Sequence, residues 1–329
     1  MSGTLGLRVI EYRQLFQIVV MFLLVQFFGL LLATMLFSGV SYSTLKGSTI
    51  ASSGSGVIYY ILYIVAFAVI LSMVFKIYKG DKLFVVLEGL VIFISSYMVF
   101  LILFGSLSGS AALLVFGNGP LLPFAFAALS ALALVAAKNL RPGLRNFTAL
   151  LSSAGVGVIL GISFSFAAAM LFMFLLAIYD FIAVFITKHM LTLADAVTKK
   201  NLSFMIDVNE IEAISYSALS KADRLEYRNA NPPNSASSPL AERLKSEGLV
   251  PVAARVALGT GDLGTPLMLA VSAYSVHHNF VLSFVIVAGA SFGLALTMLI
   301  LRKYKRALPA IPPILFGILV ALAIYYLVL

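Results

Sequence analysis

The sequence predicts an all-α polytopic membrane protein with about nine transmembrane helices, and three observations support this fold class. Hydrophobic residues make up 61% of the 329 residues and charged residues 11%, with a mean hydropathy of +1.06. A soluble core needs less apolar sequence than this. The apolar residues form segments of about 20, the helical length that spans a bilayer. Finally, the basic residues gather in alternate loops between these segments.

The nine segments are separated by polar, glycine-rich or basic stretches, except at one boundary. Between the fifth and the sixth segment, residues 163–166 contain neither proline nor charge. Because residues 147–186 amount to about two spans, we predict a hairpin there and not one long helix. The predicted spans lie near residues 15–37, 57–77, 83–105, 119–137, 147–165, 166–187, 254–275, 279–300 and 307–328.

Charge placement supports this division and predicts the orientation. Cytoplasmic loops collect lysine and arginine, and nine spans with a cytoplasmic amino terminus put all 22 basic residues except Lys46 on the cytoplasmic side. The carboxyl terminus then lies outside. We therefore expect a multi-pass protein of the cell membrane, surrounded by the lipid bilayer. Its net charge of +9 is explained by the basic loops, so no nucleic-acid partner is expected.

Three regions follow from this topology. Residues 1–187 are expected to form an N-terminal membrane part with spans one to six, and residues 254–329 a C-terminal membrane part with spans seven to nine. Residues 188–253 lie between them as a cytoplasmic loop. We expect this loop to be partly disordered, because residues 229–239 are rich in asparagine, proline and serine.

Asp180 and Asp262 are acids inside apolar spans, where a carboxylate costs about 2.5 to 3.5 kcal/mol on insertion scales and therefore indicates function. Asp180 precedes Lys188 by eight residues, and Asp262 follows Arg255 by seven. At the helical rise, these spacings place the two acids about 12 and 10 Å below the cytoplasmic surface. Two acids at one depth predict a shared site.

Other site chemistries have weaker support. Glu88 lies six residues past Lys82 on the third span, but its longer side chain can reach the headgroups or pair with a lysine, so its role stays open. The chain has no cysteine and no His-Glu-x-x-His helix, so no metal or cofactor is expected. A serine–histidine site in the outer loops lacks the Gly-x-Ser-Gly signature.

The residues around Asp262 favour a paired carboxylate site. In Gly259-Thr260-Gly261-Asp262, two glycines one residue apart in a membrane helix let another backbone come close. Two carboxylates in a low-dielectric site cannot both ionise, so the pair holds one proton. The ionised member can take a proton from a water that attacks a peptide carbonyl, while the protonated member donates to the carbonyl oxygen. This is the chemistry of an aspartyl protease.

The same buried acids fit a second class of function. Paired carboxylates in membrane helices also serve ion channels and proton-coupled transporters. A transporter built of two similar halves would show an internal repeat, which the segment pattern does not contain. The protease is therefore the preferred hypothesis, with the channel or transporter as the alternative.

Three short motifs resemble those of presenilins and signal peptide peptidases, the GxGD-type intramembrane aspartyl proteases. They are Tyr179-Asp180, the glycine motif that ends at Asp262, and Pro309-Ala310-Ile311, where the family usually has Pro-Ala-Leu. The resemblance extends over the whole chain through the nine spans and the long loop. Pro266 is more typical of signal peptide peptidases, whereas the predicted orientation is that of presenilins. This combination suggests an archaeal homologue of both.

This resemblance implies a function and a set of site residues. Asp180 and Asp262 are implied as the catalytic pair, which hydrolyses peptide bonds within transmembrane segments of protein or peptide substrates. Ile311 and Thr260 depart from the usual family residues, which bears on specificity. The sequence leaves open whether copies associate as a homo-oligomer. The implied substrate-binding residues are Tyr179, Gly259, Thr260, Gly261, Pro309, Ala310 and Ile311.

A substrate helix has to unwind before its peptide bond can be cut, and its freed backbone groups then need hydrogen-bond partners. The resemblance implies that the segment before the glycine motif and the Pro309 segment pair with the extended substrate. Residues 248–252 are compatible with an extended conformation, which Pro251 would interrupt.

Overall fold

The computed structural model describes residues 12–37, 59, 81–107, 121–186, 205–215, 249–277, 280–304 and 308–328. Within these ranges, seven helices are long and apolar enough to cross a membrane. This finding confirms a helical, multi-pass membrane protein. The predicted span at 57–77 lies outside the described residues, apart from Tyr59. These seven helices are α1 (Tyr12–Phe37), α4 (Asp81–Leu107), α6 (Leu121–Leu140), α7 (Arg145–Ser163), α8 (Phe166–Phe181), α13 (Phe280–Tyr304) and α14 (Ile311–Val328). An eighth described helix, α12 (Thr260–His277), carries Asp262.

The predicted hairpin between the fifth and sixth spans is confirmed, and its turn is very short. α7 ends at Ser163, Phe164 is extended, and Ser165 caps α8 by accepting a hydrogen bond from the Ala168 N–H at 3.4 Å. Serine is a favoured N-cap residue. Phe164 is buried and stacks on Phe172 with ring centroids 5.4 Å apart. The capping serine therefore marks the break between α7 and α8, a boundary that proline or a charged residue marks elsewhere in the chain.

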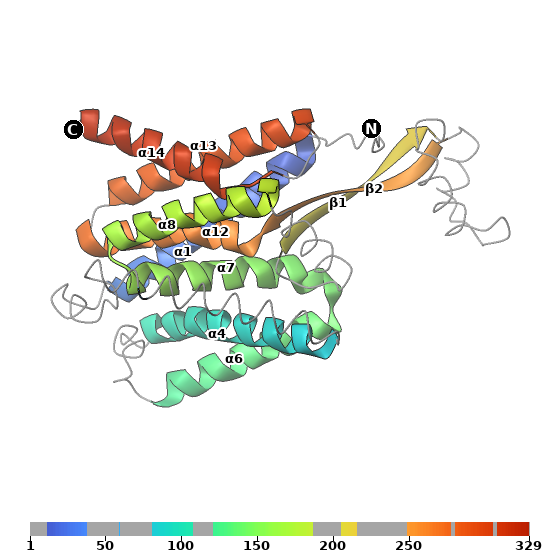
Figure 1. Ribbon diagram of the computed structural model, residues 1–329. Coiled ribbons are helices and arrows are strands. Elements are labelled where there is room, and N and C mark those ends of the chain that lie inside the picture. The colour runs from blue at the N-terminus through green and yellow to red at the C-terminus, as the bar shows by residue number, and fades with distance from the viewer. Residues whose placement is uncertain are drawn as a thin grey trace.

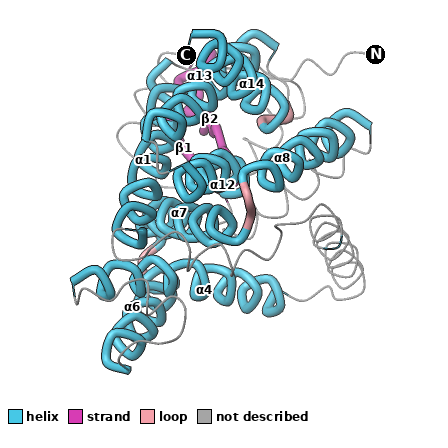
Figure 2. The backbone as a smooth tube through the Cα atoms, turned by 90° about the vertical axis from the view of Figure 1, so that its left-hand side faces the viewer, coloured by secondary structure: helices cyan, strands magenta, loops and turns pink. Residues whose placement is uncertain are grey.

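Helix α12 lies at the centre of the bundle, enclosed by α1, α7, α8 and α13 (Figure 2). Glycines let the neighbouring helices approach it, as in other membrane bundles. A Cβ atom would lie 2.2 Å from the Leu267 side chain at Gly29 and 2.7 Å from it at Gly157. Gly161 packs in the same way on Val271. Gly157 and Gly161 thus let α7 pack closely on α12.

Two glycines of α13, Gly289 and Gly293, also let helices pack closely. A Cβ at Gly289 would lie 2.6 Å from the Gly317 carbonyl oxygen, and one at Gly293 would lie 2.3 Å from the Pro313 carbonyl oxygen. These contacts hold α13 against α14, which is the helix that follows the Pro309 motif. Because backbone atoms on the facing helix cannot move aside, the two helices have no room for a side chain at these points.

From α4 onward, the described helices alternate in direction along the chain (Figure 1). Gln26 and Gly29 of α1 face Leu263 and Leu267 of α12 in rising order, so these two helices are parallel. Helices α4, α7 and α14 run in the same direction as α1 and α12, and α6, α8 and α13 run back. The end where α12 begins is also the end where α8 finishes.

The predicted start of the seventh span at residue 254 is wrong. Residues Leu249–Gly259 form strand β2, and helix α12 begins only at Thr260. β2 pairs antiparallel with β1 (Met205–Ser215), from Met205 opposite Gly259 to Ser215 opposite Leu249. A short apolar run does not distinguish a strand from a buried helix by its periodicity, and the valines of this run favour the strand.

The β hairpin projects from the bundle end where α12 begins (Figure 1). Its root is packed into the core, because Ile206, Val208 and Leu258 are all buried there. Strand β1 was not predicted, since it falls inside the region expected to be a loop. The strands therefore anchor the start of α12 to the rest of the bundle.

Glu88 forms a buried ion pair with Lys138, which joins α4 to α6. Their side chains are 1% and 8% exposed. Pairing with a lysine was one of the two structural roles expected of Glu88, although Lys138 was assigned to a cytoplasmic loop. The pair lies on α4 and α6, away from the helices that carry Asp180 and Asp262.

We expect Glu88→Leu or Lys138→Met alone to lower the free energy of unfolding by about 3 to 5 kcal/mol, because each leaves the other charge in apolar surroundings. The double variant removes both charges, so its free energy of unfolding should be close to that of the wild type. Denaturation in detergent micelles measures this difference. A single variant as stable as the wild type would contradict a structural role for the pair.

Candidate active site

Asp180 lies one residue before the end of α8 and is 5% exposed. The backbone N–H of Ile311 donates a hydrogen bond of 3.2 Å to its Oδ2 atom, and the adjacent Ala310 N–H also favours the carboxylate electrostatically. After Phe181 the chain continues as a π-helical turn, Ile182–Ile186. Such turns often occur at functional sites. The start of α14 is therefore held directly against the Asp180 carboxylate.

Asp262 is the third residue of α12, and its side chain turns back over the start of that helix. The Gly259 backbone N–H favours the Asp262 carboxylate electrostatically, and a side chain at this third helical position is well placed to cap the helix. Asp180 lies close enough for its charge to interact with that of Asp262, and α8 packs on α12. The structure thus brings the two predicted acids together.

The glycine motif spans a strand-to-helix junction, which corrects the expectation of two glycines within one membrane helix. Gly259 ends β2 and Gly261 lies in the first turn of α12. A Cβ at Gly259 would lie 3.2 Å from Asp262 Oδ2, whereas one at Gly261 would meet nothing within 4 Å. Gly259 therefore makes room for the carboxylate, and Gly261 borders open space.

The depth expected for Asp262 also changes, because it assumed a helical rise from Arg255. Residues up to Gly259 are extended, and a strand rises about 3.3 Å per residue. The chain from Arg255 to Asp262 can then span roughly 18 Å, compared with the 10 Å expected for a helix. The chain is therefore long enough for Asp262 to lie deeper below Arg255 than the sequence indicated.

The Pro309 segment is packed beside Asp180. Pro309, Ala310 and Ile311 are all buried. Ile311 is the first residue of α14 and Pro312 and Pro313 follow it. Because the first N–H groups of a helix have no partner within it, proline fits at this point and the Ile311 N–H is free to bind Asp180. This backbone donor could not be predicted from the residue type.

Two other predicted site residues lie beside the acids. Tyr179 is 56% exposed on the outer side of α8, and Thr260 is the half-buried first residue of α12. Among the described residues, no hydrogen bond joins Tyr179 or Thr260 to Asp180 or Asp262. Their roles in binding a substrate stay predictions.

We expect Gly259→Ala to lower kcat by about tenfold, because its methyl group would displace the Asp262 carboxylate and a shift of about 1 Å can cost up to 10²-fold. Gly143→Ala is the control, because Gly143 lies between α6 and α7, outside the site, and an added Cβ there also meets nothing within 4 Å. Steady-state cleavage kinetics measure both variants. Equal kcat values for Gly259→Ala and the wild type would contradict the role assigned to Gly259.

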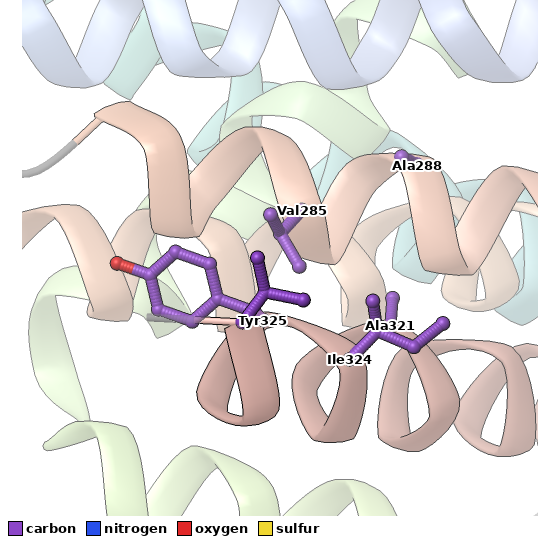
Figure 3. A pocket seen from close by; sticks show the side chains of 6 residues that line it. Val285, Ala288, Ala321, Ile324 and Tyr325 are labelled. Carbon is purple, nitrogen blue, oxygen red and sulfur yellow. The ribbon is translucent and has the colours of Figure 1, made fainter.

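An apolar groove of about 350 Å³ lies between α13 and α14 (Figure 3). It is near the far end of α14, since Tyr325 follows Ile311 by fourteen residues, roughly 21 Å along a helix. None of the described residues that line it is acidic. Its lining residues are Val285, Ala288, Ala321, Ile324, Tyr325 and Val328.

Comparison with known families decides between the two hypotheses. Residues 19–328 match the family described as signal-peptide peptidase, presenilin aspartyl protease. The chain belongs to this family. It is therefore an intramembrane aspartic endopeptidase, and the ion channel or transporter alternative is not favoured. A comparison with curated proteins finds no match.

Solved structures of a presenilin family intramembrane aspartate protease have the same fold. One, in space group C222, is 21% identical with a TM-score of 0.55, over 94% of this chain and 96% of that chain. Another, in space group P2, is 22% identical with a TM-score of 0.57, over 95% of this chain and 97% of that chain.

Proposed function

We propose that Asp180 and Asp262 are the catalytic pair of this protease. The observation that supports the proposal is their meeting at one place: Asp180 is fixed by the start of α14 and Asp262 by the start of α12, within electrostatic range of each other. The two residues come from different helices, so the site forms only in the folded bundle.

In the proposed reaction, one carboxylate is ionised and the other is protonated. The ionised member takes a proton from a water as the water oxygen attacks the carbonyl carbon of the peptide bond, and the protonated member gives its proton to the carbonyl oxygen. The tetrahedral intermediate then collapses. The C–N bond breaks, the leaving nitrogen receives a proton, and the pair again holds a single proton.

We propose that the substrate is an unwound transmembrane segment that pairs with strand β2. Its freed N–H and C=O groups need partners that lipid does not provide. In the described part of the chain β2 has one strand neighbour, β1, which leaves its second edge for strand addition. β2 leads directly into Thr260 and Gly261, and Pro309 and Ala310 lie against the other acid. Substrate could thus lie between the two segments.

We also propose nine crossings, with the amino terminus and the β hairpin on the cytoplasmic side of the cell membrane. Parallel helices α1 and α4 support this topology, because a chain that crosses twice in one direction has to return between the two crossings (Figure 1). The predicted span at 57–77 would supply that return. The excess of basic residues in alternate loops supports the cytoplasmic assignment.

Reconstituted cleavage tests the proposed function. Wild-type protein in liposomes should cut a single-span peptide within its transmembrane segment, and mass spectrometry of the two products locates the bond. A peptide with a hydroxyl group in place of the scissile carbonyl should inhibit, while a serine-directed reagent and a chelator should not. Cleavage blocked by the serine-directed reagent or the chelator would contradict the paired carboxylates.

A further inference from the structure

Gln26 is a buried amide in the middle of α1, with 0% of its surface exposed. Its Nε2 atom donates a hydrogen bond of 2.9 Å to the backbone carbonyl of Leu263, the residue that follows Asp262. An amide in apolar surroundings is costly unless it is hydrogen-bonded. This bond therefore ties α1 firmly to the first turn of α12.

The first turn of α12 lacks one backbone hydrogen bond of its own. Pro266 lies inside this helix, and proline has no N–H to donate to the carbonyl four residues earlier, which is that of Asp262. The turn that carries the Asp262 carboxylate is thus less restrained than a regular helical turn. Gln26 supplies a donor at the adjacent carbonyl, that of Leu263.

Helix α1 contacts α12 again one turn further on. The side chain of Leu267 packs on Gly29, where an added Cβ would lie 2.2 Å from Leu267 Cδ2. Gln26 and Gly29 are three residues apart, so they lie on one face of α1. The hydrogen bond lies before Pro266 and the packing contact after it. Together they restrain the position of this part of α12 along its axis and its rotation about that axis.

We propose that Gln26 is a positioning residue for the proteolytic reaction. Through its hydrogen bond to Leu263, it holds the first turn of α12 and keeps the Asp262 carboxylate where it can act with Asp180. This inference rests on the proposed function of Asp262. Gln26 contacts neither the acids nor the proposed position of the substrate. Loss of its hydrogen bond should therefore lower kcat and leave KM unchanged.

Gln26→Met removes the donor and nearly conserves the volume. We expect kcat per active site to fall about tenfold with KM within about twofold of the wild type. Active sites are counted by titration with the hydroxyl-containing inhibitor, so loss of folded protein does not lower the measured kcat. Gln17→Met makes the same change at a half-buried position of α1 and should keep the wild-type kcat. Gln26→Glu, whose protonated carboxyl group can donate to Leu263, should regain part of the rate.

A second substitution tests the link to Pro266. Pro266→Ala restores an N–H for the Asp262 carbonyl, so Gln26→Met/Pro266→Ala should be faster than Gln26→Met alone. Should Gln26→Met not fold, Gln26→Asn takes its place, because its amide is one methylene too short to reach Leu263. A wild-type kcat per active site in the variant without the donor would overturn the inference. Active Asp180→Asn or Asp262→Asn variants would instead overturn the proposed function itself.

Discussion

Asp180→Asn and Asp262→Asn are each expected to abolish cleavage of a single-span substrate, with kcat lower by about 10²- to 10⁴-fold or more. Asparagine has nearly the same shape as aspartate but can neither accept nor release a proton at working pH, so each change removes one partner of the acid–base pair. Because the two carboxylates act as a unit, the double variant should be no less active than either single variant. Product formation in liposomes, followed by mass spectrometry, measures all three.

The control for this prediction is a third membrane acid outside the site. Glu88→Gln removes a buried carboxylate that pairs with Lys138, and its kcat per folded molecule should match that of the wild type. Thermal unfolding shows whether each variant is folded. If a folded Asp180→Asn or Asp262→Asn variant still cleaves at a rate close to that of the wild type, the paired mechanism is wrong.

Ile311→Pro is expected to lower kcat by about 10- to 100-fold, although it changes no acidic residue. The Ile311 N–H donates to Asp180 Oδ2 at 3.2 Å, and proline removes that donor. Hydrogen bonds to charged groups contribute about 1.5 to 3 kcal/mol, which corresponds to this range of rates. Proline is well tolerated at the first position of a helix, so the start of α14 should persist.

Ile311→Ala is the matched control, because it removes apolar side-chain atoms from the same buried position and keeps the N–H. We expect Ile311→Ala to lose stability by about 2 to 5 kcal/mol while it retains a kcat much closer to that of the wild type. Cleavage kinetics and unfolding in detergent separate the two effects. Equal kcat values for the proline and alanine variants would show that the N–H at position 311 does not contribute to catalysis.

Hydropathy and charge predicted most of the membrane fold, because the length and polarity of a span are local properties of the sequence. The same reasoning identified Asp180 and Asp262, since an acid in an apolar span is visible without any structure. The break at Ser165 was predicted from span length alone, and the structure shows that a serine cap makes it.

The elements that the sequence did not predict depend on contacts between distant residues. Strand β2 had the apolar composition of a helix, and what makes it a strand is its pairing with β1 across a long insertion. The Ile311 N–H is a backbone group, which no residue type reveals. The role of Gln26 could not be predicted either, because the hydrogen-bond partner of one amide in a long apolar helix depends on how α1 and α12 pack together.

A cross-link between the two acid positions tests the central claim, that Asp180 and Asp262 face each other, most directly. The chain contains no cysteine, so Asp180→Cys/Asp262→Cys adds the only two thiols. A short bis-thiosulfonate reagent should join them through two disulfides, and the two halves should stay linked after the chain is cut within residues 216–248, until those disulfides are reduced. Tyr179→Cys/Asp262→Cys is the control, because Tyr179 is exposed on the outer side of α8. We predict a cross-link in the first pair and none in the second; reactive thiols at 180 and 262 that fail to link would contradict the account.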